Sequence, residues 1–366
     1  ARPKLRFVRA RRLSAAPLGV LELEWRSIGE CFGERVLESR FNGRRGCSGW
    51  CRELNAMPMN SLNLSIALAR AGGEVLDEFD SGTPEELFHY TDTAGLIGIL
   101  SGKGELWATD VRCMNDTDEL ALGTSLLHRA IQNQATHPAQ ALLARLLQHP
   151  AYVSGIVFTI SFTSERDQLS QWRAYANDAA GFAIGFRSAE LTKLTLDGKE
   201  IAKYLVRVEY KPAAQELQAQ RLIQRMLETL CPLVGRTLDD QDEQLLATAL
   251  GLVLVTFAAA SKNCGFVEEA EHRLVLRSNQ DPILPPGAKP QLTMLRCNFR
   301  AGRYGLTPFV KLHFPEDGLT QTLSRIVIGP RAKSPDTEQK VRALLANAGV
   351  RNWSKFPIDR AVATYR

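Results

Sequence analysis

Strand-like and helix-like segments alternate irregularly from about Ser61 onward, and this order restricts the folds open to the chain. Runs of β-branched and aromatic residues predict strands, whereas apolar residues recurring with a period near 3.6 predict helices. A doubly wound fold needs a regular strand–helix–strand series, and this chain has none. We therefore expect an α+β fold with a mixed, mainly antiparallel sheet, flanking helices and a helical insertion.

The same patterns divide the chain into elements. Predicted strands occupy residues 86–91, 105–110, 155–164, 181–186, 203–210, 265–276, 292–299, 309–314, 324–330 and 352–356. Predicted helices occupy residues 62–79 (broken by Gly72 and Gly73), 92–104, 115–132, 139–148, 167–176, 212–230 and 238–262, and another follows Pro335. We interpret residues 60–366 as one α+β domain in which the stretch near 212–262 is the insertion.

Residues 1–56 differ from the rest of the chain in charge. They hold 11 Arg and one Lys against six Glu and no Asp, whereas the remainder balances 33 basic against 34 acidic residues. The main body therefore offers no general phosphate-binding surface. The segment shows no sustained period, and the first Met is Met57. Two hypotheses remain open for it: translation upstream of the natural start, or a basic tail that is disordered.

Cysteine usage and hydropathy indicate a cytoplasmic protein. The seven Cys are scattered, odd in number and show only a C-x₃-C pair, so reduced thiols are expected. The most apolar stretch, residues 245–260, is short for a membrane span and predicts a buried helix. We expect no membrane association.

Several common site motifs are missing. The stretch "GILSGKG" lacks the spacing of a Walker phosphate loop, and no G-x-G-x-x-G follows a strand. The six His show neither H-x₃-H nor H-E-x-x-H, so no metal site is predicted. No nucleophile elbow G-x-S-x-G is found.

Two candidate stretches bring polar and aromatic side chains to strand ends. In "LFHYT", His89 lies on a short strand among apolar neighbours, where a structural role is the alternative. In "ISFTSERDQLSQWRAYANDAAGFAIGF", a strand delivers Ser161 and Thr163 at its end, and the next helix carries Trp172 and Tyr175. Hydroxyls at a strand end also serve as turn formers.

The third candidate is "GFVEEAEHRLVL", residues 265–276. Read as one strand, it places Glu269, Glu271 and Arg273 in a row on one face, with the two acids roughly 6.5–7 Å apart. The opposite face carries His272 and the apolar residues that follow it. A solvated edge with a salt-bridge ladder is the alternative to a substrate cleft.

Together these stretches resemble a bacterial family catalogued as domain of unknown function 2971. "LFHYTDTAGLIGIL", "GELWATDVRCMNDTDEL", "SFTSERDQLSQWRAYANDAAGFAIGF" and "FVEEAEHRLVL" match its phrases over residues 87–356, with a gap across the long helices. The chain departs from the family phrase at His272, where a Trp is expected.

The order of the motifs is in turn similar to that of ADP-ribosyltransferases, which split NAD⁺ at the nicotinamide–ribose bond. The resemblance implies an ADP-ribosyltransferase-like fold and NAD as substrate. It implies catalytic roles for Glu271, at the ribose 2′-hydroxyl, and for Glu269, at the acceptor. The implied NAD-binding residues are His89 (which holds the adenosine-side ribose), Tyr90, Ser161, Thr163, Trp172 or Tyr175 (either stacking on nicotinamide), and Arg273.

That chemistry suits the residues. Cleavage leaves a ribose with oxocarbenium character, which a fixed carboxylate stabilises. Arg273 is expected to bias Glu271 towards its charged form. Asp116 and Glu119 either line the cleft or cap a helix. Three functions stay open: transfer of ADP-ribose to a protein, nucleic acid or small molecule by a toxin or defence protein; hydrolysis of NAD⁺; and non-catalytic binding.

Overall fold

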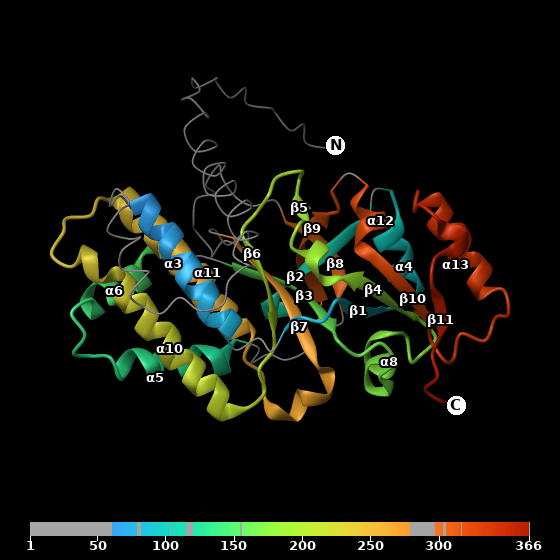
Figure 1. Ribbon diagram of the computed structural model, residues 1–366, viewed down its shortest axis with the longest axis horizontal. Helices are drawn as coiled ribbons and strands as arrows, with labels where there is room; N and C mark the ends of the chain where they lie inside the picture. Colours follow the sequence, from blue (N-terminus) through green and yellow to red (C-terminus); the bar gives the residue numbers. More distant parts are fainter. Residues whose placement is uncertain are drawn as a thin grey trace, which may run out of the picture. The chain divides into compact units, whose positions relative to one another are not determined.

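The computed structural model describes residues 61–78, 82–102, 104–114, 120–153, 156–278, 297–302, 305–315 and 317–365 (Figure 1). All of them belong to one compact unit, Asn42–Arg366. The basic segment 1–56, Asp116 and Glu119 lie outside the described residues, as does most of the strand expected at 292–299.

An eleven-stranded sheet forms the centre of the fold. Ten strands pair in antiparallel fashion, and β11 pairs with β10 in parallel. The main path runs β11-β10-β4-β1-β3-β2-β9-β5, with β7 between β3 and β6, and β8 beside β9. The predicted α+β class with a mixed, mainly antiparallel sheet is confirmed. The strands are β1 Glu86–Thr91, β2 Glu105–Asp110, β3 Ile156–Thr163, β4 Phe182–Arg187, β5 Thr195–Leu196, β6 Lys203–Arg207, β7 Glu271–Ser278, β8 Asn298–Gly302, β9 Gly305–His313, β10 Leu323–Ile328 and β11 Ile358–Arg360.

The sheet forks at β3. One edge of β3 pairs with β7 along its full length. The other edge pairs with β2 at Phe158 and Thr159, and with β1 only at Thr163. Strands β1 and β2 therefore diverge, and the β3 residues between these points have no ladder partner on that edge. We call this opening the sheet fork.

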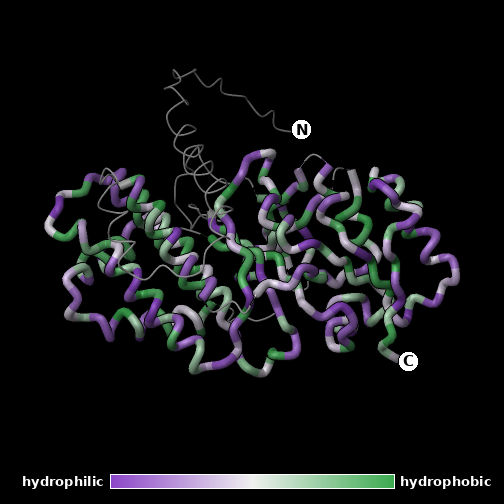
Figure 2. The backbone as a smooth tube through the Cα atoms, viewed as in Figure 1, coloured by the Kyte–Doolittle hydropathy of each residue, from purple (hydrophilic) through white to green (hydrophobic). Residues whose placement is uncertain are grey.

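The helices fall into two groups. Helices α3, α5, α6, α10 and α11 share one apolar cluster and pack on one another; α10 and α11 are thus covered by helices that precede them in the sequence (Figure 1). The sheet has its own core, and Figure 2 shows apolar stretches in both the strands and this helix group. The helices are α3 Ser61–Glu78, α4 Thr93–Leu100, α5 Ala121–Gln132, α6 Gln140–Gln148, α7 Pro150–Val153, α8 Leu169–Tyr175, α9 Ser188–Leu191, α10 Pro212–Leu230, α11 Asp240–Ala259, α12 Gly318–Thr322 and α13 Thr337–Asn347.

Helix α11 is the one described helix long and apolar enough to cross a membrane. About 61% of its most apolar window is buried inside the protein, where it packs on α3, α5 and α7. The helix begins with a capping box in which Asp239 accepts from the backbone of Asp242. Residues 245–260 thus form the buried helix predicted from their composition.

Three local predictions are wrong. Helix α3 runs through Gly72 and Gly73 without a break. A Cβ at Gly72 would lie 2.2 Å from Val253 of α11, so the glycine permits close packing of the two helices. The expected strand at 352–356 is a short 3₁₀ turn, and the strand follows at β11. The strand expected from Gly265 begins only at Glu271.

Candidate active site at the sheet fork

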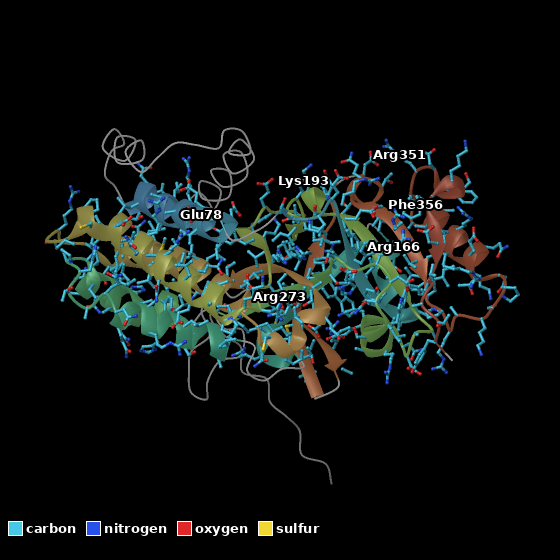
Figure 3. The ribbon with its side chains drawn as sticks, turned by 60° about the horizontal axis from the view of Figure 1, so that its bottom comes forward. Glu78, Arg166, Lys193, Arg273, Arg351 and Phe356 are labelled. Atoms are coloured by element: carbon cyan, nitrogen blue, oxygen red, sulfur yellow. The ribbon has the colours of Figure 1, made fainter. Side chains whose placement is uncertain are left out.

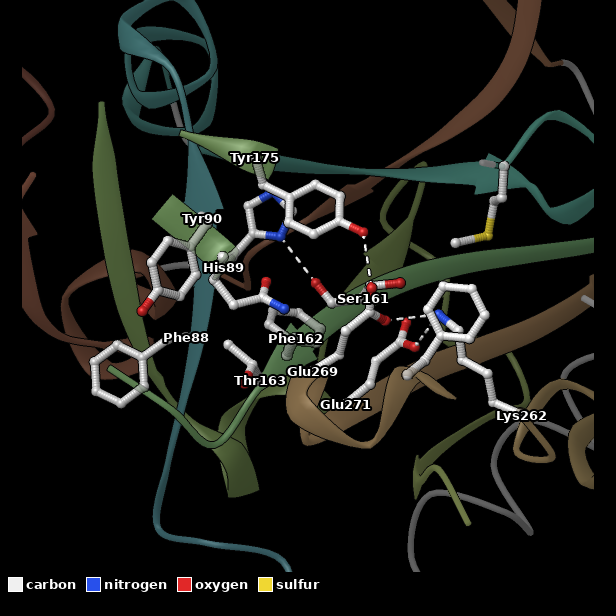
Figure 4. A pocket seen from close by; sticks show the side chains of 13 residues that line it. Phe88, His89, Tyr90, Ser161, Phe162, Thr163, Tyr175, Lys262, Glu269 and Glu271 are labelled. Carbon is white, nitrogen blue, oxygen red and sulfur yellow. Dashed lines mark hydrogen bonds and ion pairs between the residues drawn. The ribbon is translucent and has the colours of Figure 1, made fainter. Parts of the chain in front are cut away.

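A pocket of about 240 Å³ opens at the sheet fork (Figure 4). Strands β1 and β3, helix α8 and the 3₁₀ turn η3, Cys264–Glu269, contribute its walls together with the start of β7. The lining residues are Phe88, His89, Tyr90, Met114, Ser161, Phe162, Thr163, Gln171, Tyr175, Lys262, Phe266, Glu269 and Glu271. His89 and Glu271, expected to open onto one cleft, both line it.

His89 fills the fork at the point where ladder hydrogen bonds are missing. Its Nδ1 lies 2.9 Å from the backbone oxygen of Ser161. A carbonyl oxygen only accepts, so Nδ1 is assigned the proton and Nε2 keeps a lone pair. Burial lowers the pKa of His89 against the effect of that hydrogen bond, and the positive charge of Arg300 lowers it further. The imidazole is therefore neutral at pH 7 and offers an acceptor.

Glu271 is the first residue of β7 and is buried. Its carboxylate accepts from Arg273 Nε at 2.8 Å and from Arg273 Nη2 at 2.9 Å, and Lys262 Nζ lies 3.2 Å away. Burial alone would raise the pKa of Glu271, but the charge and hydrogen bonds of Arg273, aided by Lys262, lower it to about 2. The backbone N–H of Glu271 donates to the Tyr210 hydroxyl. Glu271 is therefore a fixed, charged carboxylate.

Glu269 does not share a strand with Glu271, and that prediction is wrong. Glu269 ends the turn η3, and Ala270 adopts a left-handed conformation with φ of 43° before β7 begins. The two acids meet instead through Lys262, whose Nζ lies 2.6 Å from Glu269 Oε2. Tyr175 donates from its hydroxyl to the other oxygen of Glu269 at 3.1 Å.

Arg273 supports the site from behind and does not line the pocket. Its side chain is fully buried, and its Nη1 donates to the backbone oxygen of Ala259 at the end of α11; Figure 3 shows Arg273 in the interior. The predicted direct contact between Arg273 and NAD does not fit this position. Its predicted effect on the charge of Glu271 does fit, because the two side chains form two hydrogen bonds.

The two aromatic candidates of α8 occupy different places. Trp172 is fully buried, donates to Asp167 and packs its ring on Tyr90, so the prediction that it stacks on a ligand is wrong. Tyr175 lines the pocket with 39% of its surface exposed. Tyr90 also lines the pocket, and its hydroxyl joins the backbone of Glu165 and Gln168.

The two hydroxyl residues of β3 that line the pocket, Ser161 and Thr163, differ in their hydrogen bonds. Thr163 accepts from the backbone of Glu165 and so forms the turn after β3. Ser161 Oγ is buried and has no hydrogen-bond partner by ordinary geometry, although it is close enough to help lower the pKa of Glu271. Both residues line the pocket, and Ser161 is the one with an unused hydroxyl.

Sequence reasoning missed Lys262, the cation that joins the two acids. Lys262 is buried and its Nζ lies 4.7 Å from the centre of the Phe266 ring. Its one signal is position: it is the first charged residue after the apolar run 245–260. Gln171, Phe266 and Met114 were also missed. Among the described residues, no three His, Cys, Asp or Glu side chains gather as metal ligands.

The arrangement offers acceptors to a hydroxyl-bearing ligand. The two carboxylates are charged and paired with the cations Lys262 and Arg273, and a neutral imidazole offers one more acceptor. The Tyr175 ring supplies an aromatic surface on the same pocket. Such a group of residues suits a sugar whose anomeric carbon becomes cationic.

Comparison with known proteins supports the predicted family. The family model described as "Protein of unknown function (DUF2971)" matches residues 171–274, a range that includes Tyr175, Lys262 and both acids. A search of curated proteins finds no match, and a search of solved structures finds none either.

Proposed function

We propose that the protein is an NAD-dependent ADP-ribosyltransferase that acts in the pocket at the sheet fork. The observation that carries the proposal is the convergence of Glu269, Glu271 and His89 on one pocket. Glu269 comes from the turn η3, Glu271 from β7 and His89 from β1. An ion-pair ladder on a solvated edge, the alternative interpretation of the acids, would not place a neutral imidazole acceptor beside them.

In the proposed reaction, the bond between ribose C1′ and the nicotinamide nitrogen breaks and its electron pair leaves with nicotinamide. The ribose gains oxocarbenium character, and an acceptor nucleophile then bonds to C1′ while its proton moves to a carboxylate. Glu271 Oε1 accepts a hydrogen bond from Arg273 Nε, and a carboxylate oxygen has two lone pairs. It can therefore accept a ribose 2′-hydroxyl while staying charged.

Glu269 suits the acceptor side. Its side chain is 19% exposed, against 6% for Glu271, and the ion pair with Lys262 keeps it beside Glu271. His89 Nε2 would accept from a ribose hydroxyl. The ring of Tyr175 would stack on nicotinamide, which leaves no role in the pocket for Trp172.

A non-catalytic function is the second candidate, and Lys262 favours it. Lys262 binds both acids, so its charge opposes their stabilisation of a cationic ribose. A protein that only binds a nucleotide in this pocket would tolerate such a lysine.

A cytoplasmic location and a role as a toxin or defence protein are further parts of the proposal.

Incubation of labelled NAD⁺ with purified protein and cell extract separates these functions. Label on a macromolecule supports transfer, free ADP-ribose alone supports hydrolysis, and neither product with measurable NAD⁺ binding supports the non-catalytic function. Glu269→Gln should abolish transfer and slow NAD⁺ cleavage without abolishing it, because Glu271 stays at the ribose. Glu268→Gln is the matched control, because Glu268 is exposed and does not line the pocket. Equal activity of wild type and Glu269→Gln would refute the proposed role of the acids.

A further inference from the structure

Trp107 of β2 and Arg300 of β8 form an aromatic and cationic surface over the buried ring of Phe309 of β9, and we call these three side chains the Trp107 strip. The rings of Trp107 and Phe309 stack with centres 4.3 Å apart. The Arg300 guanidinium lies 5.6 Å from the Trp107 ring centre and 5.8 Å from that of Phe309. Trp107 is 36% exposed, and its Nε1 donates to Glu105, so the ring is held in place.

Arg300 lacks a counter-ion within the described part of the chain. Its guanidinium is half-buried and makes one hydrogen bond there, from Nη2 to Thr109 Oγ1 at 2.8 Å. Lys311, the neighbouring cation, is paired with Glu105 at 2.9 Å. A guanidinium has five N–H donors, so Arg300 keeps donors with which it can bind an anion.

The strip adjoins the pocket through the fork. Thr109, which accepts from Arg300, pairs across the sheet with Thr159 of β3. Thr159 lies two residues before Ser161, on the same face of β3. Arg300 is also near enough to His89 for its charge to be felt there. A ligand leaving the pocket past His89 would therefore meet Arg300 and then Trp107.

A dinucleotide needs more room than the pocket gives. Pockets that enclose a drug-sized ligand measure about 300–1,000 Å³, against about 240 Å³ here, so we expect part of a dinucleotide to lie outside the pocket. Guanidinium groups bind phosphate through paired hydrogen bonds, and exposed aromatic rings stack on bases.

We propose that the Trp107 strip binds the nucleoside diphosphate part of the ligand, with phosphate on Arg300 and the base against Trp107. This deepens the proposed function, and the identity of the whole ligand as a dinucleotide rests on it. The binding itself does not, because a nucleoside diphosphate alone would occupy the strip without filling the pocket or undergoing bond cleavage.

Calorimetric titration of the full chain with ADP tests the proposal. Arg300→Gln and Trp107→Ala should each weaken ADP binding by about tenfold or more, whereas Arg300→Lys should weaken it less. Arg236→Gln is the control, because Arg236 is exposed on the loop between α10 and α11. Titrations with inorganic pyrophosphate and with adenosine separate the two halves: Arg300→Gln should affect the first, and Trp107→Ala the second.

Two results would overturn the proposal. One is wild-type protein that shows no ADP binding. The other is ADP affinity that is unchanged in both strip variants when their thermal unfolding matches that of wild type. Neither result depends on NAD⁺ cleavage, so the strip can fail while the enzyme activity stands. Conversely, if ADP binding requires Arg300 but the protein does not cleave NAD⁺, the Trp107 strip is supported as a binding site and the proposed enzyme activity is refuted.

Discussion

Glu271→Gln should lower the free energy of unfolding by several kcal/mol, whatever it does to catalysis. The variant keeps the size of the side chain but removes a buried charge that two cations contact. Arg273 is fully buried and would face a neutral amide in place of the carboxylate. Removing one partner of a buried ion pair typically costs about 3–5 kcal/mol.

The pKa of Glu271 gives a second value for the same loss. A carboxyl group whose pKa falls from 4.5 to about 2 on folding contributes about 3 kcal/mol at pH 7. The folded-state pKa is depressed, so this stability is fully present above the unfolded value. It disappears as the pH falls from about 5 towards 2, because the unfolded carboxyl binds its proton first.

Urea unfolding at pH 7, 5 and 3 measures the effect. The difference between wild type and Glu271→Gln should be about 3 kcal/mol at pH 7 and should shrink at pH 3. Glu268→Gln, the exposed control, should stay within about 0.5 kcal/mol of wild type. A Glu271→Gln protein as stable as wild type at pH 7, or a difference that does not change with pH, would refute the buried ion-pair account. The same experiment shows why loss of activity in this variant alone cannot establish a catalytic role.

Three further predictions follow from packing and hydrogen bonding. Gly123→Ala should destabilise the protein by about 1–3 kcal/mol in urea unfolding, because its Cβ would lie 2.4 Å from the Ala258 backbone. Gly98→Ala, which lies in open space within α4, should stabilise the protein by about 0.5–1 kcal/mol. The opposite order of stabilities would contradict the helix packing. Tyr175→Phe should slow NAD⁺ consumption with an unfolding free energy within about 1 kcal/mol of wild type, and unchanged turnover would remove the Tyr175 hydroxyl from the mechanism. Burial raises the pKa of the Tyr175 hydroxyl to about 12. Spectrophotometric titration should therefore show nearly the same number of tyrosinates near pH 11 in wild type and in Tyr175→Phe. Ionisation of Tyr175 near pH 10 would contradict its contact with Glu269.

Strands β1 to β4 were predictable because each has a strong local pattern, whereas β5 was missed and β11 was expected six residues too early. Strand β3 is a run of apolar and β-branched residues, and β1 and β2 are short runs between turn-forming residues. Helix α4 was predictable from its cap, since Asp92 accepts from the backbone of Gly95. Such signals lie within a few residues of each other, so no tertiary contact is needed to interpret them.

The site was predictable only in part, because long-range contacts decide the rest. Alternation along β1 places His89 on the same face as the core residue Leu87, and only the fork explains how its ring reaches Ser161. A positive φ at Ala270 breaks the alternation between the two acids, and such a conformation is rare for alanine. Lys262 joins those acids through a turn that no periodic pattern reveals.

Release of nicotinamide from NAD⁺ by the purified protein tests the central claim most directly, because both transfer and hydrolysis begin with that bond. Chromatography should detect nicotinamide formed by wild type and by Glu268→Gln, and less with Glu269→Gln, which lacks the acceptor-side carboxylate. A folded wild-type protein that binds NAD⁺ but releases no nicotinamide, with or without cell extract, would contradict the account.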